Sequence, residues 1–405
     1  MLSDRFQTLD SQTLIKFIIL LPLIWCFSGM YIFANGDKIL NGLVLIVLIV
    51  RFHSFGLQGI TENIKNNKFL WIIIANLCFA VVAYFTYGIS SNRFRMLTLA
   101  MLYLSILPLD LLKQLSFRYL TWTLSISVII FLFIQYLDGH LFTRNWTINP
   151  IRIGVISAIL VNMNIYYSIL DTDKKSKIVS VCLAILTMLP LISSLSRSTW
   201  IAFVICFIFL IFKIVNIKKI NIKIVLTLFI LAVSMVVALK KPIEERIKIT
   251  AWEIEQIQSN QLNTSIGLRL QVWKIGAYII KSNWLTGVGN TGQIEIKQHL
   301  VNIGEVSQEA ANLVHLHNQW INDLAKYGLL GIILTLLLIV YPLYASRNKS
   351  SQIPILILSC IYLTMTLTDM PLERSHPLGF YLICVYFLLQ NPSKTKQTKA
   401  LKGEK

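Results

Sequence analysis

Long apolar segments alternate with short polar loops along almost the whole chain. A helix needs about 20 apolar residues to cross the hydrocarbon core of a membrane, and the pattern predicts about twelve such spans. Their expected ranges are Leu14–Ala34, Ile39–Phe52, Phe69–Ile89, Met96–Leu112, Tyr119–Leu137, Ile151–Leu170, Ile178–Ser193, Thr199–Val215, Ile220–Leu239, Leu329–Ala345, Ile353–Leu367 and Leu378–Leu389. The sequence therefore predicts an all-α polytopic membrane protein.

One long polar stretch, residues 240–328, interrupts this pattern and is called the insert below. It divides the chain into residues 1–239 with nine expected spans, the insert, residues 329–390 with three spans, and a basic tail over 391–405. Apolar residues at 268, 272, 275, 279 and 280 share one helical face. We expect the insert to contain short helices, this amphipathic one lying across the mouth of the bundle.

Composition excludes a soluble fold of this size. The 405 residues are 55% hydrophobic and only 14% charged, with a formal net charge of +18. Because the basic residues are interleaved with apolar runs, the charge indicates membrane topology and membrane-lipid contact, with no nucleic acid as partner. All six cysteines fall within apolar segments, which argues against a disulfide framework or a cysteine metal site.

The positions of the basic residues predict the orientation. Loops that share a side with the N-terminus are rich in lysine, and such loops remain in the cytoplasm. The insert is then outside, which in a bacterial inner membrane is the periplasm. Basic residues on the short outer loops are Lys38, Arg93, Arg95, Arg144, Arg152, Arg197 and Arg374. Arginine grips phosphate in two-point fashion, although single outer arginines can simply contact lipid headgroups.

Two arginines are candidates for binding an anionic substrate. Arg197 lies in a tight link between two apolar runs, where an unpaired arginine would be costly. Arg269 falls in the first turn of the amphipathic helix, where the helix N-terminus also favours an anion. A headgroup contact for Arg197 and a solvated face for Arg269 are the alternatives.

The insert ends in a histidine pair, His315 and His317, followed by Asn318 as the expected cap of the next helix. Histidine can take and return a proton near neutral pH, so either is a candidate general base. A zinc site is an alternative, with a third ligand from His299, Glu305 or Glu309, but no recognisable spacing supports it. We therefore assign no metal and no cofactor.

Two further loops at the outer end carry weaker signals. Gly287-Val288-Gly289-Asn290-Thr291-Gly292 resembles a phosphate-cradling loop but lacks the GK[ST] ending, so we interpret it as a flexible turn. Asp369 and Arg374 lie in the last outer loop. There the carboxylate could orient an arginine or a histidine, or form a structural ion pair.

At these residues the chain resembles the O-antigen ligases of lipopolysaccharide assembly, within the broader O-antigen ligase and polymerase superfamily. The resemblance rests on His317-Asn318, nine residues from Gln319 to Tyr327, and Gly328-Leu329-Leu330-Gly331. Other matching stretches are Ser196-Arg197-Ser198, Gly267-Leu268-Arg269-Leu270, Leu285-Thr286-Gly287-Val288-Gly289, and Asp369 with Arg374. About twelve spans with one large late periplasmic loop also match the family.

The resemblance implies a GT-C-like glycosyltransferase that moves O-antigen from undecaprenyl pyrophosphate to a sugar hydroxyl of lipid A-core. His317, helped by His315, would be the base; Arg197 and Arg269 would bind the pyrophosphate without metal; Asp369, Arg374 and Asn318 would support them. An O-antigen polymerase, a protein O-oligosaccharyltransferase and a non-enzymatic glycolipid flippase remain alternatives. A transporter should place ionisable residues near the bilayer midplane, whereas the candidates here gather at the outer mouth.

Overall fold

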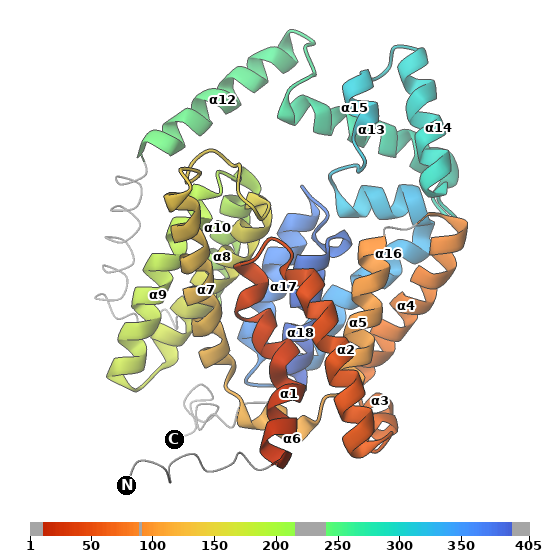
Figure 1. Ribbon diagram of the computed structural model, residues 1–405. Helices are drawn as coiled ribbons and strands as arrows, with labels where there is room; N and C mark the ends of the chain where they lie inside the picture. Colours follow the sequence, from red (N-terminus) through yellow and green to blue (C-terminus); the bar gives the residue numbers. More distant parts are fainter. Residues whose placement is uncertain (1–10, 89–90, 215–239, 391–405) are drawn as a thin grey trace.

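A computed structural model describes residues 11–88, 91–214 and 240–390, and within these ranges the secondary structure is entirely helical (Figure 1). Before the insert the helices are α1 Ser11–Cys26, η1 Gly29–Tyr31, α2 Gly36–Phe55, α3 Ile60–Asn66, α4 Lys68–Thr86, α5 Ser91–Ile106, α6 Leu109–Gln114, α7 Phe117–Leu137, α8 Pro150–Leu170, α9 Lys174–Ser193 and α10 Arg197–Ile214. Then follow α12 Lys240–Gln258, α13 Ser265–Asn283, α14 Gly289–Asn302, α15 Gln308–Asn312, α16 Gln319–Ser346, α17 Gln352–Thr366, η3 Pro371–Glu373 and α18 Ser375–Gln390.

Seven of the described helical segments are long and apolar enough to cross a membrane. They are Thr13–Tyr31, Gly36–Phe55, Lys68–Thr86, Phe117–Leu137, Pro150–Leu170, Lys174–Ser193 and Gln319–Ser346, with α17 and α18 as shorter apolar helices. These elements lie at predicted spans, whereas the predicted span Ile220–Leu239 lies outside the described residues. The predicted span at 96–112 is divided into α5 and α6 by Pro108, the cap residue of α6. The total of about twelve stays a prediction.

Helices α8 and α18 form the centre of the bundle. In α8, 83% of the apolar window is buried, against 22% in α2, and every residue of α18 before Gln390 is buried. Peripheral helices direct large apolar side chains outward, for example Ile49 and Phe85. An outward apolar surface around a buried centre is what a lipid environment requires of a multi-pass protein.

The insert forms a cap over one end of the bundle, with α3 and α6 at the opposite end (Figure 1). The predicted amphipathic helix is confirmed as α13. Its apolar face, with Val272, Ile275 and Ile279, packs in a second small core with Leu316 and Ala325. This core joins the insert to the first turns of α16, so the segment carrying the two candidate histidines is fixed from both sides.

A sharp kink at Gly328 divides α16, with φ 66° and ψ −161°. The glycine-rich turn packs directly against this kink: Val288 N–H donates to the Ala325 carbonyl at 3.0 Å, and Leu329 N–H donates to the Leu285 carbonyl at 3.1 Å. The Gly287 amide is likewise bonded, to the Asn283 carbonyl. These amides are therefore not available to cradle phosphate, and the expected flexible turn is a packed joint.

Substitution of Gly328 by alanine should destabilise the fold. A Cβ there would lie 2.2 Å from the Leu285 carbonyl oxygen, and the left-handed backbone alone costs an L-residue about 1–2 kcal/mol. We expect Gly328→Ala to lower the thermal unfolding midpoint of the detergent-purified protein clearly. Gly42→Ala is the control, because a Cβ at Gly42 meets nothing within 4 Å. Equal midpoints for the two variants would contradict the packed joint.

Candidate functional site

His317 lies in the short connection between α15 and α16, where its backbone has φ 49°. This left-handed conformation is rare for residues other than glycine and marks a strained position. Asn318 holds it: its side chain accepts from the N–H groups of Trp320 and Ile321 at 3.0 and 3.1 Å and donates to the Leu367 carbonyl at 2.9 Å. The predicted cap is therefore confirmed, and it also joins this connection to the end of α17.

Burial is the first cause that lowers the pKa of His317, and the charges of Arg269, Arg374 and Lys297 lower it further. The carboxylate of Asp369 acts in the opposite direction. The structure thus brings the predicted residues His317, Arg269, Asp369 and Arg374 into one electrostatic neighbourhood. A neutral imidazole at physiological pH is the protonation state that a general base requires.

His315 lies in the same cationic surroundings. Burial, followed by the charges of Arg374, Lys326, His317 and Lys297, lowers its pKa to about 3. Its imidazole is therefore neutral over the physiological range. Among the described residues, no group of three histidine, cysteine or carboxylate side chains is arranged to hold a metal ion, so the third ligand of the zinc alternative has no candidate there.

Arg197 begins α10 and is bound to the insert. Its Nη1 donates to Glu253 Oε2 at 2.8 Å and to Thr250 Oγ1 at 2.7 Å, both on α12. Two residues before Arg197, Leu195 has φ 50°, a second strained position. The sequence nominated Arg197 but not its buried partner Glu253, because nothing in the spacing links residues on separate elements.

Arg269 follows the N-terminus of α13, whose cap Thr264 accepts from Gly267 N–H at 3.1 Å. Burial lowers the pKa of its guanidinium, with the charge of Asp369 raising it and that of Arg197 lowering it. The two predicted phosphate-binding arginines therefore act on each other. Mutual repulsion between cations is relieved when an anion binds between them.

Two further arginines share this region. The pKa of Arg144 is lowered first by burial and then by the charges of Arg246, Arg269 and Arg197. Arg144 has φ 61°, so it is a third strained non-glycine residue at this end. The sequence grouped Arg144 with the outer arginines but did not single it out, and Arg246 of α12 was missed.

The last outer loop contains an ion pair that the sequence did not predict. Glu373 accepts from Arg93 Nη1 at 2.7 Å, and Asp323 lies 3.8 Å from the same nitrogen. Thr335 in turn donates to Asp323 at 2.7 Å. The two carboxylates of this loop therefore act differently. Glu373 forms a direct ion pair with Arg93, whereas Asp369 acts on His317 and Arg269 through its charge.

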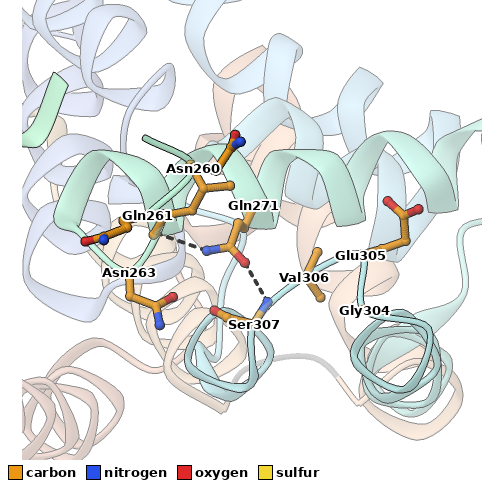
Figure 2. Close-up of a pocket in the computed structure, with 9 residues that line it drawn as sticks. Asn260, Gln261, Asn263, Gln271, Gly304, Glu305, Val306 and Ser307 are labelled. Atoms are coloured by element: carbon orange, nitrogen blue, oxygen red, sulfur yellow. Dashed lines mark hydrogen bonds between the residues drawn. The ribbon is translucent and has the colours of Figure 1, made fainter. Parts of the chain in front are cut away.

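A separate polar recess of about 530 Å³ lies between the turns at 260–263 and 304–307. Figure 2 shows that Asn260, Gln261 and Asn263 point in different directions and do not converge on a common point. The buried amide of Gln271 donates to the Leu262 carbonyl at 3.0 Å and accepts from Ser307 N–H at 2.6 Å. Both ends of this amide are committed, so it joins the two turns and is not a free ligand-binding group.

Fold and site together define a multi-pass membrane protein with a histidine and several arginines at one end of its bundle. Residues 182–336 match the family model described as O-Antigen ligase. This match supports the membership of the chain in the O-antigen ligase and polymerase superfamily, and the resemblance predicted from the motifs is confirmed. The matched range contains Arg197, Arg269 and His317 but ends before Asp369 and Arg374.

The chain is also similar to an uncharacterised protein of Haemophilus influenzae. The two are 29% identical over 171 residues, which cover 41% of this chain and 42% of that relative. The chain thus matches less than half of the relative's length. Since the relative's description states no activity, it adds no functional assignment.

The depressed pKa of His315 predicts that acid weakens the fold. In the unfolded chain a histidine takes up a proton near pH 6.5, whereas in the fold His315 does so only near pH 3. Stability should therefore fall as the pH drops below about 6.5. We expect the thermal midpoint of His315→Gln to fall less between pH 7 and pH 5 than that of the wild type.

The control for this measurement is His53→Gln, which alters an exposed histidine of α2. It should keep the wild-type dependence on pH. Identical slopes for His315→Gln and the wild type would contradict the assigned environment of His315.

Proposed function

We propose that this protein is an O-antigen ligase that transfers glycan from undecaprenyl pyrophosphate to a sugar hydroxyl of lipid A-core at the periplasmic face of the inner membrane. The family covers O-antigen ligases and polymerases, and it acts on lipid-linked polysaccharides. The observation that carries the proposal is the half-buried His317 imidazole, with its lowered pKa, beside the charges of Arg269 and Arg374. A base and an anion-binding surface are the two elements that this transfer needs.

In the proposed reaction, His317 accepts the proton of the acceptor hydroxyl as its oxygen attacks the anomeric carbon of the donor glycan. A glycosidic bond forms and the bond from the anomeric carbon to the phosphate oxygen breaks. Undecaprenyl pyrophosphate leaves with the bonding electrons. Asp369 stabilises the imidazolium that forms, because its charge favours protonated His317.

Arg197 and Arg269 stabilise the negative charge that develops on the leaving pyrophosphate. In the absence of donor, Glu253 neutralises Arg197 at 2.8 Å. Arrival of a pyrophosphate offers this guanidinium a second anion, and its planar fork can bind carboxylate and phosphate oxygens with different N–H groups. Fixed guanidiniums can thus perform the electrostatic work that a divalent cation performs in other phosphate sites.

Substitutions in this machinery should abolish or weaken transfer in a reconstituted assay with purified lipid donor and lipid A-core. Loss of a general base costs about 10²–10⁴-fold, so His317→Ala should reduce kcat by that order. Arg197→Ala should weaken donor use about 10²-fold. EDTA should have no effect, and Arg95→Ala, an exposed arginine on α5, is the matched control. Undiminished transfer by His317→Ala would remove the base assignment.

The acid limb of the pH–rate profile should respond to charges around His317. Asp369 raises the pKa of His317 and Arg374 lowers it. Asp369→Asn should therefore keep the base neutral to lower pH and move the acid limb downward, whereas Arg374→Gln should move it upward. Profiles of kcat/KM for both variants measure these shifts, and shifts in the same direction would contradict the assignment.

A deletion strain separates the proposed ligase from its relatives. Loss of a ligase leaves free lipid A-core together with accumulated lipid-linked polymer. Loss of a polymerase instead leaves cores that carry single repeat units. Glycolipid trapped on the inner leaflet would indicate a flippase.

A further inference from the structure

A second buried cluster lies beside the proposed site and takes no part in the mechanism above. Arg152 lies in the first turn of α8, and its Nη1 is 3.1 Å from Nδ1 of His376 in the first turn of α18. His376 is only 2% exposed, and its backbone carbonyl accepts from the Tyr31 hydroxyl at 3.3 Å. The contact therefore joins the two central helices of the bundle at their ends.

The hydrogen-bond partners fix the tautomer of His376. A guanidinium can only donate, so Nδ1 accepts from Arg152 and the ring proton of the neutral imidazole is on Nε2. Nε2 faces Asp37 Oδ1 at 3.8 Å, and the other oxygen of Asp37 accepts a hydrogen bond from Ser375. The hydrogen bond from Arg152 orients the ring on one side. On the other side Asp37 acts only through its charge, because 3.8 Å is too long for a hydrogen bond from Nε2.

Arg152 differs from Arg93 and Arg197 in the kind of group that it contacts. Arg93 and Arg197 each contact a carboxylate directly, at 2.7 and 2.8 Å. In the described ranges no carboxylate lies within 4 Å of Arg152, and its direct partner is a neutral ring. The neutral His376 ring can fix the direction of the Arg152 guanidinium without neutralising its positive charge. Asp37 lies on the opposite side of the ring from Arg152 and compensates that charge only over this longer distance.

Arg152 lies next to the proposed site, because its partner His376 is two residues from Arg374. The charges of Arg374 and Asp369, which have opposite signs, both act on its guanidinium. His376 occupies one of the five N–H groups of the guanidinium, so the others are available to an anion. A cation in a membrane-spanning helix is costly, so it pairs with another group or marks a substrate path.

We propose that His376, oriented by Asp37, is a positioning residue that aims Arg152 at the pyrophosphate of the lipid donor. This inference rests on the proposed function and adds a third arginine to the donor site. The negative charge of Asp37 favours the ring orientation in which Nε2–H faces it and Nδ1 faces Arg152, and the guanidinium that Nδ1 holds contacts phosphate.

The test compares four variants of the full-length protein: Arg152→Ala, His376→Phe, His376→Asn and the double variant of Arg152→Ala with His376→Phe. Phenylalanine retains the ring volume without an acceptor, whereas the asparagine oxygen can take the place of Nδ1. Farnesyl pyrophosphate, a short lipid pyrophosphate, is the binding probe, and KM for the full donor is measured in parallel.

Arg152→Ala and His376→Phe should each weaken farnesyl pyrophosphate binding and raise the donor KM about tenfold, with kcat changed less than twofold. The double variant should be no worse than Arg152→Ala alone, because His376 acts through Arg152. His376→Asn should restore most of the binding. Additive losses in the double variant, or unchanged binding by His376→Phe, would overturn the inference.

Two comparisons keep the outcome interpretable. If His376→Phe unfolds, His376→Asn combined with Asp37→Asn provides the test: binding must fall below that of His376→Asn alone. Since binding is measured without glycan transfer, a wild type that binds the probe but transfers nothing would sink the proposed ligase and leave the donor-site arrangement standing. If the wild type transfers glycan and His376→Phe binds farnesyl pyrophosphate as well as the wild type does, the proposed ligase stands and the positioning role of His376 is overturned.

Discussion

The buried ion pair network of Arg93 holds the proposed site together. Arg93 is 1% exposed and joins Glu373 of η3 to Asp323 of α16, at 2.7 and 3.8 Å. Removing one partner of a buried pair typically costs about 3–5 kcal/mol, because the other charge stays buried without compensation. His317 precedes α16, and Asp369 precedes η3. The network therefore fixes the distance between the imidazole and the carboxylate that acts on it.

At this end of the bundle, the arginines that stabilise the fold differ from the proposed substrate-binding arginines in how completely carboxylates enclose them. Arg93 is fully enclosed by two carboxylates and the Thr335 hydroxyl, so it can hold the fold but cannot receive a substrate anion. Arg197 is paired but partly accessible, with 26% of its side chain exposed. Burial is the largest cause that lowers the pKa of Arg269, while the charge of Asp369 raises it and that of Arg197 lowers it. The three arginines therefore differ in how completely carboxylates enclose them, and Arg197 and Arg269 are the ones that remain accessible enough to receive the anion of the proposed substrate.

Hydropathy predicted the positions of the seven described spans because each span is a local property of about 20 consecutive residues, but it did not predict the division at Pro108. The cap at Asn318 was equally local. The same reasoning could nominate His317, Arg197 and Arg269 by residue type, but it could not find their partners. Arg93 and Glu373 are 280 residues apart, and Arg152 and His376 are 224 apart. One sequence contains no signal for such pairs, since each is created only when distant helices pack.

The strained backbone of His317 is a consequence of how its neighbours are held. On one side the buried Leu316 side chain belongs to the small core of the insert. On the other, the Asn318 cap binds both the start of α16 and the carbonyl of Leu367. The single residue between these two anchors adopts φ 49°, at a cost of about 1–3 kcal/mol for a non-glycine residue. Glycine at position 317 would relieve this backbone strain but would remove the imidazole. The proposed function therefore explains why a strained histidine occupies the position.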